Sequence, residues 1–200
     1  DLFEGHFSDV TTLCFSPDGY LLASGSADHT VRLREVGSGL TLHTLPLGAA
    51  LTQVLFTPNG RHLLCAAADG RVRTMSSAGG PPLRTLSRHL AAVRALALSP
   101  DGRLLATASE DQLARIWDQS SGRVLRTLAG HLGAVCAAAF SPDGARIITT
   151  SGDSRHPLGE DQQIPDQQGE LQRARRSLAW TRGRVTDQAG RQRTRAGMPA

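Results

Sequence analysis

The chain of 200 residues carries 22 basic residues, all of them arginine, against 18 acidic residues, which gives a formal net charge of +4. Its length is sufficient for one domain with a buried core, and it contains no apolar run long enough for a membrane-spanning helix. Residues 1–154 hold 13 arginines and 13 acidic residues, so the excess charge lies in residues 155–200. A neutral N-terminal part argues against nucleic-acid binding, because domains with that function usually carry a basic surface.

A turn-forming segment recurs along the chain at a nearly constant distance. It reads Phe-Ser-Pro-Asp-Gly at 15–19 and returns with small changes at 56–60, 98–102 and 140–144, at intervals of 41, 42 and 42 residues. Proline, Asp or Asn, and Gly are the residues that tight turns require. A fixed period of this length indicates a repeated supersecondary unit.

The first repeat shows the order of the expected elements. Apolar and small residues at 10–15, 20–26, 31–34 and 40–45 predict four short strands separated by turn residues. Each repeat is therefore expected to form one four-stranded antiparallel sheet. The predicted repeats are 5–45, 46–86, 87–128 and a partial one at 129–154.

The pattern fails after Asp153. Pro157 falls where the fourth repeat requires its third strand, and proline removes a hydrogen bond from a paired strand. Residues 155–200 are rich in Arg, Gln and Gly and poor in large apolar residues, so we predict that this tail is disordered. The expected organisation is thus an all-β part at 1–154 followed by a disordered tail at 155–200.

The three cysteines, Cys14, Cys65 and Cys136, form no CxxC pair and lie in apolar runs. We expect them to be buried free thiols, as in a protein of the reducing cytosol.

Other positions around the turn recur with the same period. The place ten residues before the Ser or Thr of the turn holds His6, Leu47, His89 and His131, and the place twelve residues after it holds Asp28, Asp69, Asp111 and Asp153. The third repeat closes on Trp117-Asp118. This combination resembles the WD-repeat (β-transducin repeat) family over residues 1–153. The resemblance implies β-propeller blades, and four of them suggest an incomplete ring.

The resemblance also implies structural roles for these residues. In the third repeat, His89, Thr107, Asp111 and Trp117 match a hydrogen-bonded tetrad that ties the strands of one blade together. The other repeats match it in part, at His6, Ser24, Asp28, Asp69, His131, Thr149 and Asp153. Cys65 and Met75 stand at tetrad places in the second repeat, and Arg34 replaces tryptophan in the first.

Other interpretations of the recurring residues are weaker. The His and Asp residues occur once per repeat, so they cannot converge on one metal or catalytic centre. We therefore predict no catalytic residues, no metal and no cofactor. Ser-Pro and Thr-Pro dipeptides could be kinase sites, but the turns require them in any case. The arginine-rich tail could bind nucleic acid or an acidic partner, although it lacks lysine and interleaved aromatic residues.

The resemblance implies a non-enzymatic scaffold that binds proteins, without a small-molecule substrate or a membrane. Its contact face would carry the fourth-to-first and second-to-third strand loops. The candidate contacts there are Arg94, Glu110, Thr11 and Thr52. Ser120 stands where the adaptors of ubiquitin ligases carry arginine in Trp-Asp-x-Arg, so that role is not supported.

The chain opens within a repeat, and we expect it to be a fragment or truncated isoform of a larger protein. The amino-acid sequences of its repeats are most similar to those of large multi-propeller proteins of centrioles and cilia. This similarity implies microtubule or centriolar partners and a location in the cytoplasm, centriole or cilium. The alternative is an aberrant splice product without a function of its own.

Overall fold

A computed structural model of the chain describes residues 5–152 and 162–163. This described part contains strands and turns and no helix. The strands of the first sheet are β1 (Val10–Phe15), β2 (Leu21–Ser26), β3 (Thr30–Glu35) and β4 (Thr41–Pro46). Those of the second sheet are β5 (Leu51–Phe56), β6 (His62–Ala67), β7 (Val72–Ser76) and β8 (Arg84–Leu86). Those of the third sheet are β9 (Val93–Leu98), β10 (Leu104–Ser109), β11 (Ala114–Asp118) and β12 (Val124–Leu128). Those of the fourth sheet are β13 (Val135–Phe140), β14 (Arg146–Ser151) and β15 (Gln162–Gln163).

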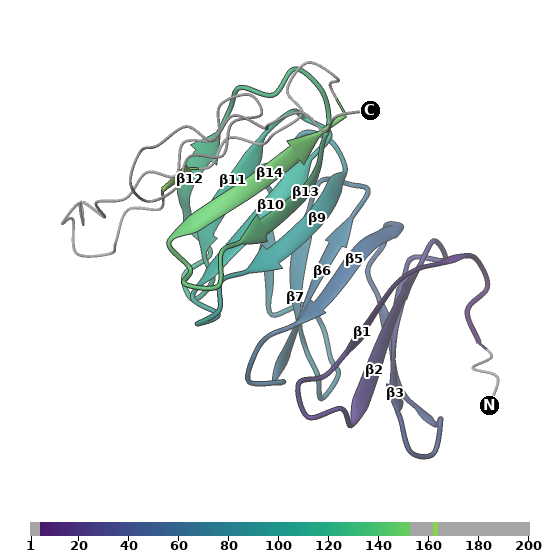
Figure 1. The fold of residues 1–200 in the computed structure, drawn as a ribbon. Coiled ribbons are helices and arrows are strands. Elements are labelled where there is room, and N and C mark those ends of the chain that lie inside the picture. The colour runs from purple at the N-terminus through teal and green to yellow at the C-terminus, as the bar shows by residue number, and fades with distance from the viewer. Residues whose placement is uncertain (1–4, 153–161, 164–200) are drawn as a thin grey trace, which may run out of the picture. The chain divides into compact units, whose positions relative to one another are not determined.

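Each sheet pairs its strands in chain order, and every pairing is antiparallel (Figure 1). The all-β architecture of four-stranded antiparallel sheets predicted from the sequence is therefore confirmed. In the fourth sheet the third strand is the short β15, in which Gln163 and Gln162 pair with Arg146 and Ile147. The predicted tail at 155–200 otherwise lies outside the described residues.

The recurring segment forms the turn between the first two strands of each sheet. In the first sheet the Ser16 hydroxyl donates to Asp18, and the same carboxylate accepts the backbone N–H of Tyr20 at 3.0 Å. Gly19 adopts a φ of 72°, a left-handed conformation that residues with a side chain rarely adopt. The glycines of the other three turns have φ values of 69° to 70°. The turn predicted from the sequence is confirmed in all four sheets.

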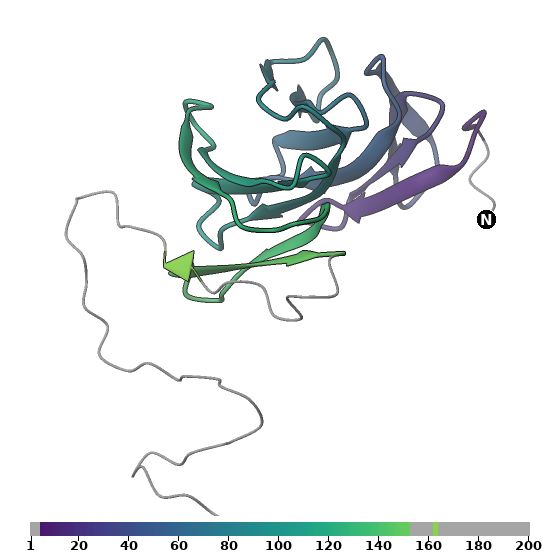
Figure 2. The same cartoon turned by 90° about the horizontal axis from the view of Figure 1, so that it is seen from above.

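The core lies between consecutive sheets, which lie side by side in the order of the chain (Figure 2). The cluster between the first and second sheets contains Ala23, Val31, Leu33, Val54, Phe56 and Met75. The next one contains Leu64, Ala66, Val72, Leu96, Leu105 and Trp117, and the last contains Ala106, Ala108, Ile116, Val135 and Ile147. Each inner sheet therefore buries one face against the sheet before it and the other against the sheet after it.

Side-chain hydrogen bonds also join the first strands of neighbouring sheets. Thr11 Oγ1 donates to the carbonyl of Leu51 at 2.7 Å, and Thr52 Oγ1 donates to the carbonyl of Val93 at 2.5 Å. Gln53 Oε1 accepts the backbone N–H of Leu96 at 2.6 Å. These bonds link β1 to β5 and β5 to β9 at corresponding places, so they fix the spacing of successive sheets.

The cysteines differ in their burial. Cys65 is buried, as expected, and burial raises the pKa of its thiol to about 12 despite the opposing charge of Arg73. Cys14 is half-buried and Cys136 is exposed, so the prediction of burial is wrong for Cys136. Its strand, β13, belongs to the last described sheet, and Val135 and Ala138 of this strand pack in the core cluster shared with β10 and β11, whereas Cys136 is not part of that cluster.

Candidate functional site

The third sheet brings together the four residues of its expected tetrad. His89 precedes β9, Thr107 lies on β10, Asp111 lies in the turn after β10, and Trp117 lies on β11. His89 Nδ1 is 2.9 Å from Asp111 Oδ2 and its Nε2 is 2.6 Å from Thr107 Oγ1, while Trp117 Nε1 donates to the same hydroxyl at 2.9 Å. The loop before β9, the turn after β10 and the strands β10 and β11 are thus linked by a single chain of hydrogen bonds.

Charge and burial in this tetrad shift the pKa values of two groups. Burial would raise the pKa of Asp111, but hydrogen bonds from Arg115 and His89 outweigh it and hold that pKa below its usual range. Burial lowers the pKa of His89 against the opposing effect of Asp111. The arrangement therefore favours a neutral imidazole that donates to an ionised carboxylate.

The first sheet keeps the polar part of this arrangement without the indole. His6 Nδ1 lies 2.8 Å from Asp28 Oδ2, and His6 Nε2 lies 2.8 Å from Ser24 Oγ. Asp28 also accepts hydrogen bonds from Thr30 and from the backbone N–H of Phe7, and these bonds outweigh its burial and lower its pKa. Arg34 stands at the place of the tryptophan and is itself buried.

The second sheet replaces most of the tetrad with apolar packing. Leu47, Cys65 and Met75 are buried at the places of the histidine, the hydroxyl residue and the tryptophan. Asp69 forms a two-point ion pair with the buried Arg73, with distances of 2.6 Å and 3.2 Å. Burial would raise the pKa of Asp69, but the hydrogen bond from Arg73 outweighs it and lowers that pKa.

In the fourth sheet His131 Nε2 lies 2.8 Å from Thr149 Oγ1. Asp153, the remaining member expected there, lies outside the described residues. The fourth sheet therefore shows the same histidine–hydroxyl contact as the first and third sheets.

An arginine four residues after the aspartate was missed by the sequence reasoning. It occurs as Arg32, Arg73 and Arg115 in the first three repeats. Arg73 pairs with Asp69, and Arg115 Nη1 donates to Asp111 at 3.0 Å. The guanidinium of Arg32 instead lies over the Phe7 ring, 5.8 Å from its centroid. The constant spacing in the sequence would have indicated these arginines.

The expected partner contacts have two different environments. Arg94 Nε donates to Glu110 Oε1 at 2.8 Å, and both side chains are substantially exposed, at 51% and 35%. By contrast, the hydroxyls of Thr11 and Thr52 donate to the backbone of the next sheet. The ion pair is therefore accessible to a partner, whereas the two hydroxyls are used within the protein.

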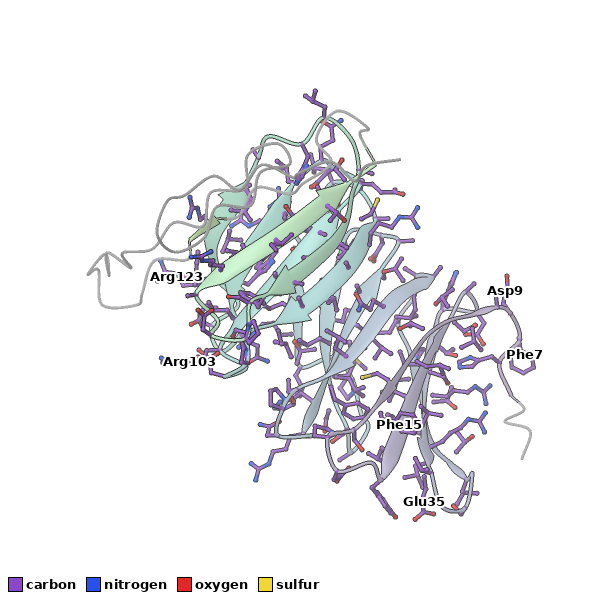
Figure 3. The ribbon with its side chains drawn as sticks, viewed as in Figure 1. Phe7, Asp9, Phe15, Glu35, Arg103 and Arg123 are labelled. Atoms are coloured by element: carbon purple, nitrogen blue, oxygen red, sulfur yellow. The ribbon has the colours of Figure 1, made fainter. Side chains whose placement is uncertain are left out.

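Three large apolar side chains at the same end of the sheets were also missed. Phe7, Leu90 and Leu132 directly follow the histidines, and they are 92%, 94% and 66% exposed. Phe7 points outward from the loop before β1 (Figure 3). The backbone N–H of Phe7 donates to Asp28 and that of Leu90 to Asp111, so the polar network holds the backbone that presents Phe7 and Leu90. An apolar residue after each histidine is the sequence signal.

Two features are absent from the described residues. These residues hold no group of three or more His, Cys, Asp or Glu arranged to bind a metal ion. Within the same residues, no helix has the length and apolar character needed to cross a membrane.

The repeated antiparallel sheets, packed face to face and each carrying all or part of one polar network, define the chain as a series of β-propeller blades. The chain belongs to the family described as WD domain, G-beta repeat, whose sequence profile matches residues 1–34, 39–74, 80–118 and 122–155. From the second match on, each matched range starts before the last strand of one sheet and continues into the next sheet. Proteins with WD repeats are generally non-enzymatic scaffolds for protein–protein interactions.

Individual relatives share shorter segments. WD repeat-containing protein 18 of Rattus norvegicus is 45% identical over 51 residues, which cover 26% of this chain and 12% of the relative. The protein of the same name from Bos taurus is 47% identical over 51 residues, with the same coverage. Protein Mut11 of Chlamydomonas reinhardtii is 51% identical over 41 residues, which cover 20% of this chain and 11% of the relative. The chain thus spans about a tenth of the length of these relatives.

Proposed function

We propose that this chain is a non-enzymatic scaffold that binds a protein partner through the loop face of its blades. The loop face is defined here by Phe7, Leu90 and Leu132 together with the Arg94–Glu110 ion pair. The start of the first strand lies beside the end of the second in each sheet, as in the pairs of Val10 with Ser26 and Val93 with Ser109. The loops before first strands and the turns after second strands therefore share one end of the sheets.

The exposure of Leu90 carries the proposal. Its side chain is 94% exposed, although Asp111 accepts its backbone N–H at 3.2 Å. An apolar side chain held in water by an ordered backbone costs solvation free energy that a partner can recover by covering it. The neighbouring Arg94 and Glu110 add charged groups that can select among partners.

The test is affinity capture with the full chain, followed by mass spectrometry of the bound proteins. We expect Leu90→Asp and Phe7→Asp to lose the same set of bound proteins. Leu40→Asp is the matched control, because Leu40 is 62% exposed in the connection between β3 and β4, at the other end of the sheet. Retention of the set by both loop-face variants, or its loss in the control as well, contradicts the proposal.

The ion pair is tested separately by exchanging its charges. Arg94→Glu alone places two carboxylates together, whereas the double variant Arg94→Glu/Glu110→Arg restores an attractive pair. If a partner contacts this pair, the double variant folds normally and still fails to bind. Unchanged binding by the double variant contradicts a contact at this pair.

A finer proposal rests on the amino-acid sequences of the repeats. It gives the chain microtubule or centriolar partners and a location in the cytoplasm, centriole or cilium. Cosedimentation of the full chain with microtubules, compared with Leu90→Asp, tests it. We likewise propose that the chain is part of a longer protein, with an aberrant splice product as the alternative. Transcript sequence beyond the codon of Asp153 that continues in WD-repeat register supports the longer protein.

A further inference from the structure

The loop before β9, residues 88–92, is fixed to the end of β10 and the turn after it. The hydroxyl of Ser109 donates to the carbonyl of Ala91 at 3.1 Å, and the backbone N–H of Leu90 donates to Asp111 at 3.2 Å. A partner that binds this loop therefore does not have to order its backbone, which lowers the entropic cost of binding.

The turn between β6 and β7 of the preceding sheet contacts the same loop. A Cβ placed at Gly70 would lie 2.8 Å from two carbonyl oxygens of loop 88–92, so the turn can approach this closely only with glycine at that place. Arg71 is the next residue in the turn, and Arg88 and Leu90 belong to the loop. These three residues, which we call the basic junction, therefore come together from two neighbouring sheets.

Two arginines of the basic junction lack a carboxylate of their own. Arg71 is 54% exposed, and its contact with Asp69, at 4.0 Å, is with a carboxylate that already forms a two-point ion pair with Arg73. Arg88 is exposed and forms no ion pair or hydrogen bond with the other described residues. The junction thus presents positive charge beside Leu90, whose side chain is 94% exposed.

We propose that the basic junction binds an acidic protein segment in which a large apolar side chain is flanked by Asp or Glu. The apolar side chain packs on Leu90, and the flanking carboxylates pair with Arg71 and Arg88. This inference rests on the proposed function, because it names the chemistry of the partner that the same loop face binds.

The charge of the blades favours a protein segment over a nucleic acid. Residues 1–154 hold 13 arginines and 13 acidic residues, so the positive charge at the junction is local and does not extend into a surface that attracts a polyanion. An exposed leucine also lacks the aromatic face on which bases stack. An apolar side chain with carboxylates close to it matches both parts of the junction.

The two kinds of contact have different roles. Exposed ion pairs contribute little individually, so the two arginines select an acidic segment without holding it by themselves. Burial of Leu90 against an apolar side chain supplies the larger part of the affinity. Binding should therefore require both the charge and the apolar group.

The test is an array of synthetic peptides probed with the full chain. Each peptide carries one central leucine, phenylalanine or methionine, and glutamates are moved through the flanking positions. Matched peptides carry glutamine or lysine in place of glutamate, or serine in place of the central residue. We expect the strongest binding with glutamate, weaker binding with glutamine, the weakest with lysine, and a loss of binding with central serine.

Fluorescence anisotropy with the strongest peptide measures the effect of substitutions. Arg71→Gln and Arg88→Gln should each weaken binding by about two- to fivefold, and Leu90→Ser by more than about tenfold. Arg88→Lys keeps the charge and should bind nearly as well as the natural chain. Arg61→Gln is the matched control, because Arg61 is an exposed arginine in the turn between β5 and β6, at the opposite end of the sheet.

Three outcomes overturn the inference. The first is equal binding of the glutamate and glutamine peptides, or no binding of either. The second is undiminished binding by the double variant Arg71→Gln/Arg88→Gln, which would assign the peptide to other arginines, such as the nine within residues 155–200. The third is tighter binding of a DNA oligonucleotide than of any peptide, with loss of that binding in the double variant.

Affinity capture separates this inference from the proposed function. If Leu90→Asp loses the captured proteins and the double arginine variant retains them, the loop face binds a partner but the partner is not an acidic segment. If Leu90→Asp and Phe7→Asp both retain the captured proteins, the loop-face proposal itself is contradicted. Circular dichroism verifies that each variant is folded.

Discussion

Thr107 Oγ1 lies 2.6 Å from His89 Nε2, and the Thr107 residue is fully buried. Because Nδ1–H of His89 donates to Asp111, Nε2 carries no proton and accepts from the hydroxyl. The same hydroxyl accepts the indole N–H of Trp117 at 2.9 Å. One hydroxyl thus satisfies a buried acceptor and a buried donor at once, which neither cysteine nor an apolar residue of similar size can do as well.

Thr107→Val removes that hydroxyl with little change in shape. It leaves the Nε2 of His89 and the N–H of Trp117 without this partner, so we expect the free energy of unfolding to fall by about 2–4 kcal/mol. Urea denaturation followed by circular dichroism measures the change. Thr107→Ser keeps the hydroxyl and should lose less than half as much. Equal losses in the two variants would show that packing, not hydrogen bonding, decides this position.

The free energy of unfolding should fall on mild acidification because of His89. Burial holds the pKa of His89 below its usual value near 6.5, so below that pH the unfolded state takes up a proton that the folded state does not. Stability contributed by the neutral imidazole is complete above that pH and is lost as the pH falls toward the pKa in the folded state. A second loss follows below about pH 4, because the pKa of Asp111 is also lowered.

Denaturation curves at a series of pH values test this dependence. His89→Gln should remove the loss that begins near pH 6.5 and retain the loss at lower pH. An identical pH profile for the variant and the natural chain would contradict the assignment to His89.

The Asp69–Arg73 pair should stabilise the second sheet in place of a tetrad. Asp69→Asn leaves the buried guanidinium with a neutral acceptor, and we expect the free energy of unfolding to fall by about 1–3 kcal/mol. Arg71→Met is the matched control, since Arg71 is 54% exposed and lies 4.0 Å from the same carboxylate. That control should change stability by less than about 0.5 kcal/mol. The double variant Asp69→Asn/Arg73→Met should recover part of the loss. If its change in the free energy of unfolding equals the sum of the changes in the two single variants, Asp69 and Arg73 are not coupled.

Thr52→Val should weaken the contact between the second and third sheets. The hydroxyl of Thr52 donates to the carbonyl of Val93, so its loss should lower the free energy of unfolding by about 0.5–1.5 kcal/mol. Thr127→Val, at an exposed position on β12, is the control and should have a smaller effect. If Thr52→Val leaves stability unchanged but abolishes partner binding, Thr52 is a contact residue and not a link between sheets.

Much of the fold could be predicted from the sequence because the decisive interactions are local. The Ser16 hydroxyl and the Asp18 carboxylate interact across two residues, and Gly19 supplies the left-handed conformation of the same turn. The residues at tetrad positions could be named because their spacing recurs with the period of the repeat. Apolar residues at the place of Leu90 and arginines at the place of Arg73 also recur in other repeats. The alternation of apolar and polar residues, however, does not distinguish a side chain that is exposed from one that is buried.

The sequence by itself determined the unit of this protein: its period, its turns, its antiparallel strands and the failure of the pattern after Asp153. Each of these depends on residues close together in the chain or on simple counting. The tertiary structure decided what each side chain does between units. Val54 and Leu13 occupy the same place in their repeats, yet one is buried and the other is exposed, because burial depends on a neighbouring sheet about 40 residues away. For the same reason, the hydroxyls of Thr11 and Thr52 could be assigned to links between sheets only once the strands lay side by side.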